Sequence, residues 1–387
     1  MRTPQERVTL WQSFILVTGF LYGTSTLFMP IGAARQDGWL SILLGMLGGI
    51  VLAWIWSLPA RWYPRWGLSG QLRFAWGRYL GTALGVLYLW YALHLSALVL
   101  RNLTELYAVA IFPETPPSVF IVGLILPTAL ASYYGWEVIH RCAEVLVIPI
   151  VLLIILLSVL TLITPGAAHW ELLTPVLDRG WGPVFQSALS VLAFPFGETV
   201  LFLLAIQHMT RPDLALKPLG RSMLLVGILL ASVFARNMVI LGPAESSRSA
   251  FPALEAARII NLAEFIQRVD ILVVILWTFG GFIKLSAVFH LFLLGSQDLF
   301  GLRDYRPLIP PVAYAVAALS VLLYQDFGEM KRFAVAGYST YALIFQAVLP
   351  LATVGLVALR RAWQRQRGRP QPARGDAGMP GSKPPLP

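Results

Sequence analysis

Ten stretches of the chain are almost entirely apolar, and short segments rich in polar residues, proline or glycine separate them. Each stretch reaches the length of roughly 18 residues or more that an α-helix needs to cross the hydrocarbon core of a membrane. The sequence therefore predicts an all-α integral membrane protein with ten transmembrane helices. The predicted spans are residues 9–33, 39–60, 80–111, 118–136, 143–164, 183–207, 214–241, 266–294, 308–325 and 338–359.

The sixth stretch is interrupted in its middle by residues 194–198, Phe-Pro-Phe-Gly-Glu. A proline, a glycine and a carboxylate at bilayer depth disfavour a continuous helix, because the freed backbone groups and the charge need partners that lipid lacks. The first stretch contains a related segment at residues 23–28, Gly-Thr-Ser-Thr-Leu-Phe, which aligns with residues 197–202, Gly-Glu-Thr-Val-Leu-Phe. We therefore expect the first and sixth helices to be broken.

These breaks divide the chain into two five-helix repeats, residues 9–164 and 183–359. Because five is odd, the second repeat enters the membrane from the opposite face, so the repeats are inverted. The topology is similar to that of the amino acid-polyamine-cation transporter superfamily. Interrupted helices in corresponding positions of such repeats indicate a small-molecule site near the membrane midplane.

The basic residues are distributed unevenly about the predicted spans. If both termini are cytoplasmic, nineteen lysines and arginines lie in inner segments and seven in outer ones, as the positive-inside rule requires. We attribute the formal charge of +10 to the basic residues that orient the chain in the membrane, and we expect no nucleic-acid partner. Residues 1–8 are then a cytoplasmic N-terminus, and residues 360–387 are a basic, disordered cytoplasmic tail.

Three connecting segments are long. Residues 61–79 are expected to form a basic cytoplasmic loop with an aromatic belt at the membrane surface. Residues 165–182 and 243–263 are predicted to form short surface helices that cap an outer vestibule.

Composition excludes several classes of protein. The chain is 57% hydrophobic and 12% charged, with a mean hydropathy of +0.70, which is far too apolar for a soluble domain. Cys142 is the lone cysteine, and the five histidines are scattered, so we expect no disulfide, metal or cofactor. Motifs for phosphate binding or nucleophilic catalysis are missing, which argues against an enzyme. The first apolar stretch is too long for a cleaved signal and should remain as a span.

Glu198 is the first candidate for a functional side chain. It follows the predicted break, where a carboxylate complements the exposed amides of a helix start, so it could serve only as a cap. At midplane depth it could equally bind the amine of a zwitterionic ligand or take up a proton. The two interpretations are compatible.

Small residues form the corresponding part of the first span. Gly19, Gly23, Thr24 and Ser25 would let the backbone unwind beside a ligand, and freed amides suit a carboxylate. Close helix packing is the alternative use of such residues in membranes, and the matching break in both halves favours the site. The predicted ligand-binding set also contains the residues that flank Glu198, namely Phe194, Phe196 and Gly197.

Charged residues in other spans need partners. Lys284 in the eighth span has no acidic neighbour in sequence, so we expect it to pair with Glu198. His94 in the third span could line the pocket, although a lone histidine is more often a packed one. Arg101 and Glu105 share a helix face at a spacing of four and should neutralise each other. Snorkelling toward the interface would explain Arg236.

Several motifs resemble the B-subunit family of bacterial spore germinant receptors. They are residues 9–12, Thr-Leu-Trp-Gln; residues 28–30, Phe-Met-Pro; residues 37–41, Asp-Gly-Trp-Leu-Ser; residues 194–198; and residues 282–286, Phe-Ile-Lys-Leu-Ser. The resemblance covers essentially the whole chain. It implies recognition of a small nutrient, commonly an amino acid, in the inner membrane of a spore, beside A-type and C-type receptor subunits.

Three functions are therefore compatible with the sequence. The first is a germinant receptor subunit that binds an amino acid or similar nutrient at the midplane and signals to its partner subunits. The second is a proton-coupled amino-acid permease that uses the same pocket. The third is an ion- or water-conducting subunit of a larger channel. Each would be a multi-pass protein of the spore inner membrane or the cell membrane, with the lipid bilayer around it.

Overall fold

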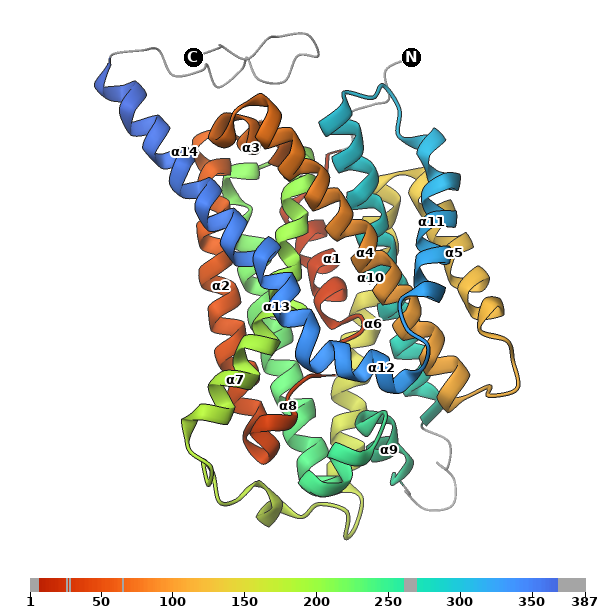
Figure 1. Cartoon of the computed structure of the whole chain (residues 1–387). Coiled ribbons are helices and arrows are strands. Elements are labelled where there is room, and N and C mark those ends of the chain that lie inside the picture. The colour runs from red at the N-terminus through yellow and green to blue at the C-terminus, as the bar shows by residue number, and fades with distance from the viewer. Residues whose placement is uncertain (1–6, 26, 28, 65, 261–269, 368–387) are drawn as a thin grey trace.

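The computed structural model describes residues 7–367, apart from residues 26, 28, 65 and 261–269. Within these residues the chain forms a bundle of long helices (Figure 1). Val8 and Met209 form an isolated parallel β-bridge. Eight segments are long and apolar enough to cross a membrane. Two shorter apolar helices, Leu10–Tyr22 and Arg306–Leu322, complete the ten predicted spans.

Each span corresponds to one helix or to a short series of helices. In chain order they are α1 (Leu10–Tyr22), α2 (Gly38–Trp62), α4 (Arg78–Ala110), α5 (Pro117–Tyr134), α6 (Trp136–Ile163), α7 (Trp181–Val191) with η3 (Leu192–Phe196) and η4 (Gly197–Leu204), α8 (Leu216–Arg248), α10 (Asp270–Phe300), α11 (Ile309–Leu322), and finally α12 (Phe327–Arg332), η8 (Phe333–Gly337), α13 (Tyr338–Leu343), η9 (Ile344–Val348) and α14 (Leu349–Gln366).

Local sequence explains where several helices begin. Thr9 and Gln12 form a capping box on α1, in which the Thr9 hydroxyl accepts a hydrogen bond from the Gln12 amide at 3.2 Å. Gly77 and Gly135 adopt φ angles of 83° and 108° directly before α4 and α6. Only glycine adopts such angles without strain, so these two positions separate consecutive helices.

Both predicted breaks are present. α1 ends at Tyr22, and Gly23 leaves the helix with φ −19° and ψ −77°. In the sixth span Phe194 has an extended backbone, with φ −139° and ψ 114°, and a 3-10 helix begins at Gly197. Such irregular backbone is tolerated at membrane depth because other helices cover it.

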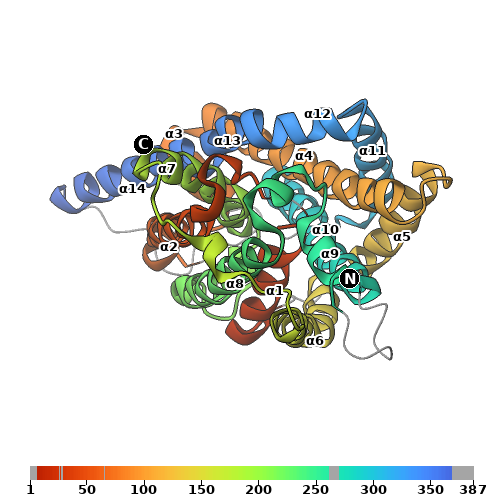
Figure 2. The same ribbon diagram turned by 90° about the horizontal axis from the view of Figure 1, so that it is seen from below.

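Helices from both repeats enclose the breaks. α1 packs against α8, α6 and α10, and α10 packs in turn against α4 and α5. In the end-on view α1 lies beside α8, and α10 lies beside α4 (Figure 2). The C-terminal end of α14 and the short helix α3 (Leu68–Trp76) lie at one end of the bundle, and α9 (Pro252–Arg258) lies at the other (Figure 1).

Some boundaries differ from the sequence prediction. The predicted loop 61–79 contains α3, whose buried face includes Leu72 and Ala75. The expectation of disorder from residue 360 is wrong for residues 360–366, because α14 continues to Gln366. There the guanidinium of Arg361 packs over the ring of Trp62 at 4.8 Å, and water can solvate the other arginine side chains of residues 360–366.

Other parts of the connecting segments agree with expectation or lie outside the described residues. The two segments that were expected on the outer side do contain short helices, η2 (Trp170–Leu173) and α9. The remainder of the predicted tail, residues 368–387, lies outside the described residues.

The docking of α3 onto α4 gives a prediction for stability. A Cβ on Gly81 would lie 2.6 Å from the backbone oxygen of Leu72 and 2.7 Å from the Cα of Arg73. Because backbone cannot yield like a side chain, Gly81→Ala should lower the free energy of unfolding by about 1–3 kcal/mol. Thermal unfolding of the purified protein in detergent would measure this.

The matched control is Gly123→Ala in α5, because a Cβ there meets no atom within 4 Å. Alanine should be neutral at this position, or stabilising by about 0.5–1 kcal/mol. Equal effects of the two substitutions would contradict the close approach of α3 to α4.

Candidate ligand-binding site

An ion pair between Glu198 and Lys284 lies at the centre of the bundle. The Lys284 Nζ is 2.6 Å from the Glu198 Oε2, and both side chains are 0% exposed. Lys284 is near the midpoint of α10, and Glu198 is the second residue of η4, directly after the break in the sixth span. The pairing expected from the sequence is therefore confirmed.

The ammonium of Lys284 occupies the space between the two breaks. It lies 4.6 Å from the ring centroid of Phe194, at the second break, and 5.1 Å from that of Phe20 on α1. A Cβ on Gly23, at the first break, would lie 2.7 Å from the Cβ of Lys284. The aromatic faces and the carboxylate together stabilise a cation at this position.

The carboxylate of Glu198 has a second partner on the last span. The Tyr338 hydroxyl donates a hydrogen bond to Glu198 Oε1 at 2.5 Å. No side chain caps η4, so the carboxylate is directed at Tyr338 and Lys284 and not at the amides of its own helix. The interpretation of Glu198 as only a helix cap is therefore wrong.

A chain of hydrogen bonds continues from Tyr338 to the third span. Because Tyr338 gives its proton to Glu198, the Tyr91 hydroxyl, 3.2 Å away, must donate to Tyr338. Gln346 Nε2 donates to the Tyr91 oxygen at 2.7 Å and to the backbone oxygen of Ala193, in η3, at 2.9 Å. The bonds from Gln346 to Tyr91, from Tyr91 to Tyr338 and from Tyr338 to Glu198 all run toward the negative charge, and such aligned bonds strengthen one another.

Tyr91, Tyr338 and Gln346 were not among the site residues expected from the sequence. Tyrosine is common in apolar stretches and carries no charge there, so neither tyrosine stands out. Gln346 offered a weak signal, because an amide in the middle of a transmembrane span needs a hydrogen-bond partner.

Three amides of the first break already have hydrogen-bond acceptors within the chain. The amides of Gly23, Ser25 and Leu27 donate to backbone oxygens of the same segment at 2.8, 3.0 and 3.2 Å. The buried Thr24 Oγ1 has no hydrogen-bond partner among the described residues, whereas the Ser25 hydroxyl donates to the Leu21 oxygen. Among the described residues of the break, the Thr24 hydroxyl is thus a polar group that a ligand could engage.

Three of the predicted residues serve in packing. A Cβ on Gly19 would lie 2.6 Å from Val147 Cγ2, so this glycine allows α1 to approach α6. A Cβ on Gly197 would first meet the side-chain amide of Gln346, with its Cδ at 2.6 Å, and then the backbone oxygen of Leu192 at 2.8 Å, so this glycine makes room for Gln346. Phe196 is 0% exposed and packs against Gly49 on α2, not beside Lys284.

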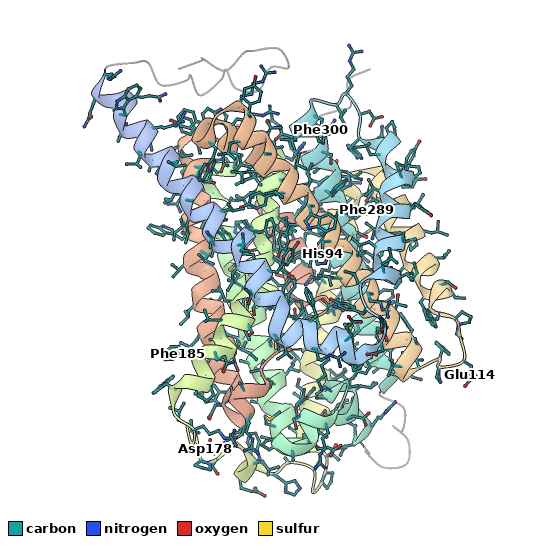
Figure 3. The ribbon with its side chains drawn as sticks, in the orientation of Figure 1. His94, Glu114, Asp178, Phe185, Phe289 and Phe300 are labelled. Carbon is teal, nitrogen blue, oxygen red and sulfur yellow. The ribbon has the colours of Figure 1, made fainter. Side chains whose placement is uncertain are left out.

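His94 lies near the midpoint of α4, about halfway along the bundle (Figure 3). Its ring stacks on Trp90 with centroids 5.8 Å apart and meets the edge of Tyr341 at 5.2 Å. Its Nδ1 has no hydrogen-bond partner among the described residues. Tyr341 also contacts Tyr91, so His94 borders the hydrogen-bond chain without a recorded contact to Glu198.

A second buried histidine, His290, lies further along α10. Its ring stacks on Trp136 with centroids 5.3 Å apart and interplanar angle 8°. Trp136, His140 and Thr199 line an adjacent cavity of about 30 Å³, which has room for one or two water molecules. This cavity is too small for an amino acid.

The remaining charged residues of the spans divide into two cases. Arg101 Nε lies 2.7 Å from Glu105 Oε1, so the predicted pair is confirmed, and Arg101 also donates to the backbone oxygens of Ser320 and Val321. Arg236 does not snorkel: it is only 6% exposed and is hydrogen-bonded inside the bundle. The sequence could not show this, because burial depends on which helices surround α8.

Comparison with solved structures identifies the fold. The chain is similar to the nucleobase-cation-symport-1 family transporter Mhp1, in a closed conformation with bromovinylhydantoin bound, with a TM-score of 0.67, 14% identity and coverage of 92% of this chain and 80% of the other. A Na⁺-coupled sialic acid symporter in a substrate-bound outward-open state gives a TM-score of 0.64 at 12% identity, covering 94% and 85%. The fold is thus that of transporters with two inverted repeats, as the sequence predicted.

Comparison of sequences identifies the family. Spore germination protein KB of Bacillus subtilis (strain 168) is 28% identical over 374 residues, which cover 96% of this chain and 99% of that protein. Residues 7–327 match the family described as spore germination protein, and this stretch contains both breaks, Glu198 and Lys284. The chain therefore belongs to the spore germination protein family of multi-pass membrane proteins.

Proposed function

We propose that this chain is the nutrient-binding subunit of a spore germinant receptor. It binds a small zwitterionic nutrient, such as an amino acid, between the two broken helices and passes a conformational change to A-type and C-type partner subunits. The spore inner membrane is its location, with both termini cytoplasmic. The single observation that carries the proposal is the fully buried Glu198–Lys284 pair between the two breaks.

The pair offers a direct mechanism for nutrient binding. An ammonium held against a carboxylate and two aromatic faces reproduces what an amino acid's amine needs, and Lys284 fills that place in the described conformation. A nutrient amine that replaces Lys284 at Glu198 would separate α10 from η4. The ligand would then bind one conformation better than the other, which is the requirement for a conformational switch.

The hydrogen-bond chain supplies a route for the signal. Glu198 is connected through Tyr338 to the last span and through Tyr91 to α4. Any movement of the carboxylate therefore changes contacts on two helices outside the broken pair. The partner subunits would recognise the resulting shift of these helices.

The alternative function is a proton-coupled amino-acid permease. Two observations favour it as the second candidate: the fold is shared with transporters, and a titratable pair is fully buried inside the bundle. A coupled carrier needs such a group in an environment that changes between its two facing states. Transport and sensing therefore have to be separated by measurement.

The coupling between Glu198 and Lys284 is testable by a double-mutant cycle. Lys284→Met leaves a buried carboxylate without its counter-charge and should lower the free energy of unfolding by about 3–5 kcal/mol. Adding Glu198→Gln removes that charge and should restore much of the loss. Unfolding of the purified variants in detergent would give the four stabilities.

Arg101→Met and Glu105→Gln form the control cycle, since this pair is slightly exposed, with 12% and 11% of the side chains accessible. The coupling free energy of this pair should be smaller than that of Glu198 and Lys284. Additive effects of Lys284→Met and Glu198→Gln would contradict an energetically important central pair.

Nutrient binding is testable with the purified protein in sealed liposomes and a labelled mixture of amino acids, with and without a pH gradient. We expect stoichiometric retention without accumulation. The double variant Glu198→Gln/Lys284→Met should fold but retain none, because it lacks the carboxylate for the amine. Glu105→Gln, another buried glutamate away from the breaks, should retain the ligand.

Accumulation that an ionophore abolishes would contradict the receptor proposal and establish the permease. No retention of any amino acid by the folded wild type would contradict the proposed class of ligand. Retention by the double variant would show that Glu198 does not bind the amine.

A further inference from the structure

The last two turns of α14 carry a dense group of arginines. Residues 360–367 contain four arginines and no acidic residue. Arg361 is half-buried, and the other three, Arg360, Arg365 and Arg367, are exposed. Arg361 and Arg365 are four residues apart on one helix face, a spacing at which like charges repel each other. The segment is therefore a concentrated positive surface.

Acidic side chains elsewhere do not balance this charge. Among the described residues, no ion pair joins the four arginines to a carboxylate. The neighbouring stretches outside the described residues, which are 1–6, 65 and 368–387, contain five basic side chains and two acidic ones, Glu6 and Asp376. Wherever these stretches lie, they add more positive than negative charge to this end of the bundle.

The positive segment extends beyond the side of the bundle. The earlier part of α14 packs against α3 and α2, and its last buried residue is Val357. Figures 1 and 2 both show the C-terminal end of the helix reaching outward past α2. Residues 360–367 consequently project from the bundle at the end where α2 also finishes.

Exposed apolar side chains lead along the bundle surface to this projection. They are Leu351, Leu359 and Trp363 of α14 and Leu47, Val51 and Trp54 of α2. In a bilayer such faces contact the lipid chains, and tryptophan is enriched at the level of the headgroups. Arg61, which is exposed, follows Trp54 by seven residues and so lies on the same face of α2. Both apolar faces therefore end in arginine where the headgroups begin.

Aromatic rings hold two of the guanidiniums in place. The guanidinium of Arg367 lies 3.9 Å from the ring centroid of Trp363, and that of Arg361 lies 4.8 Å from that of Trp62. A guanidinium packed on a ring keeps its N–H edges available, and these edges match the oxygens of a phosphate.

A third ring lies close to the same charges. Tyr63, directly after α2, stacks on Trp66 with centroids 4.1 Å apart. Burial raises the pKa of Tyr63, and the positive charges of Arg361 and Arg365 act in the opposite direction. Both guanidiniums thus lie within electrostatic reach of the end of α2.

We propose that residues 360–367, together with Arg61, bind the headgroups of anionic phospholipids in the leaflet at this end of the bundle. The guanidiniums contact the phosphate oxygens, and the exposed apolar faces contact the chains of the same lipids. A zwitterionic headgroup offers the same phosphate but carries its own cation, so a surface with this excess of positive charge selects the anionic lipid. The inference does not depend on the proposed function.

Thermal unfolding of the purified full-length protein tests the lipid site. The protein is placed in detergent micelles that contain a small fraction of phosphatidylglycerol or, at the same fraction, phosphatidylcholine. A ligand that binds the folded state raises the unfolding midpoint, so the wild type should unfold a few degrees higher with phosphatidylglycerol.

The triple variant Arg360→Gln/Arg365→Gln/Arg367→Gln should lose most of this difference. Each basic residue near an anionic lipid surface strengthens binding by about fivefold, so three removals should weaken it by about a hundredfold. The replaced side chains are exposed, and Arg361 keeps its contact with Trp62. In phosphatidylcholine the variant should therefore unfold close to the wild-type midpoint, which shows that it folds.

The matched control is Lys217→Gln/Arg221→Gln/Arg303→Gln. It removes the same charge from exposed residues on the same predicted side, at the start of α8 and just after α10. This variant should keep the difference between the two lipids. A structural role of the arginines of α14 would shift the midpoint equally in both lipids, so the difference isolates lipid binding.

Three results would overturn the proposal. Equal midpoints of the wild type in the two lipids would leave the surface for a protein partner. An equal loss in both triple variants would show a general effect of net charge and no site on α14. If sodium glycerol phosphate added to phosphatidylcholine micelles reproduced the rise, the ligand would be a soluble phosphate and not a lipid.

Discussion

The free-energy cost of burying charge inside a membrane protein governs the centre of this structure. Glu198 and Lys284 are both fully buried, and either alone would be strongly destabilising, so each requires the other. The pair joins η4 of the second repeat to α10, and Phe20 from the first repeat covers the ammonium. The two broken helices are thereby held against one lysine side chain.

The hydrogen-bond chain extends that constraint to the outer layer of helices. Tyr338 and Tyr91 are linked to the Gln346 amide nitrogen, which also donates to the backbone oxygen of Ala193, within the second break. A carbonyl group that the break releases from helical bonding is thus returned to a partner. The same groups that stabilise the irregular backbone also orient Glu198, so fold and candidate function depend on one set of contacts.

Two arginines within the spans, Arg101 and Arg236, differ in the groups that surround their positive charge. Arg101 has Glu105 at a spacing of four residues, and this neutral pair contacts the end of α11. Among the described residues, Arg236 has amide and hydroxyl partners, and a small cavity lies beside it. Among the described residues, the first arginine has a carboxylate partner and the second is held by neutral groups.

Sequence alone determined the features that arise from local chemistry. The ten spans follow from hydrophobic length, the breaks from proline, glycine and a charge at residues 194–198, and the Arg101–Glu105 pair from helical spacing. The Glu198–Lys284 pair was also predictable, because few other charges lie at that depth. Tertiary structure alone decided that Phe196 faces α2, that Tyr338 and Tyr91 reach Glu198, and that Arg236 is buried. These features depend on contacts between residues far apart in the chain, and spacing along one helix carries no information about which neighbouring helix a side chain meets.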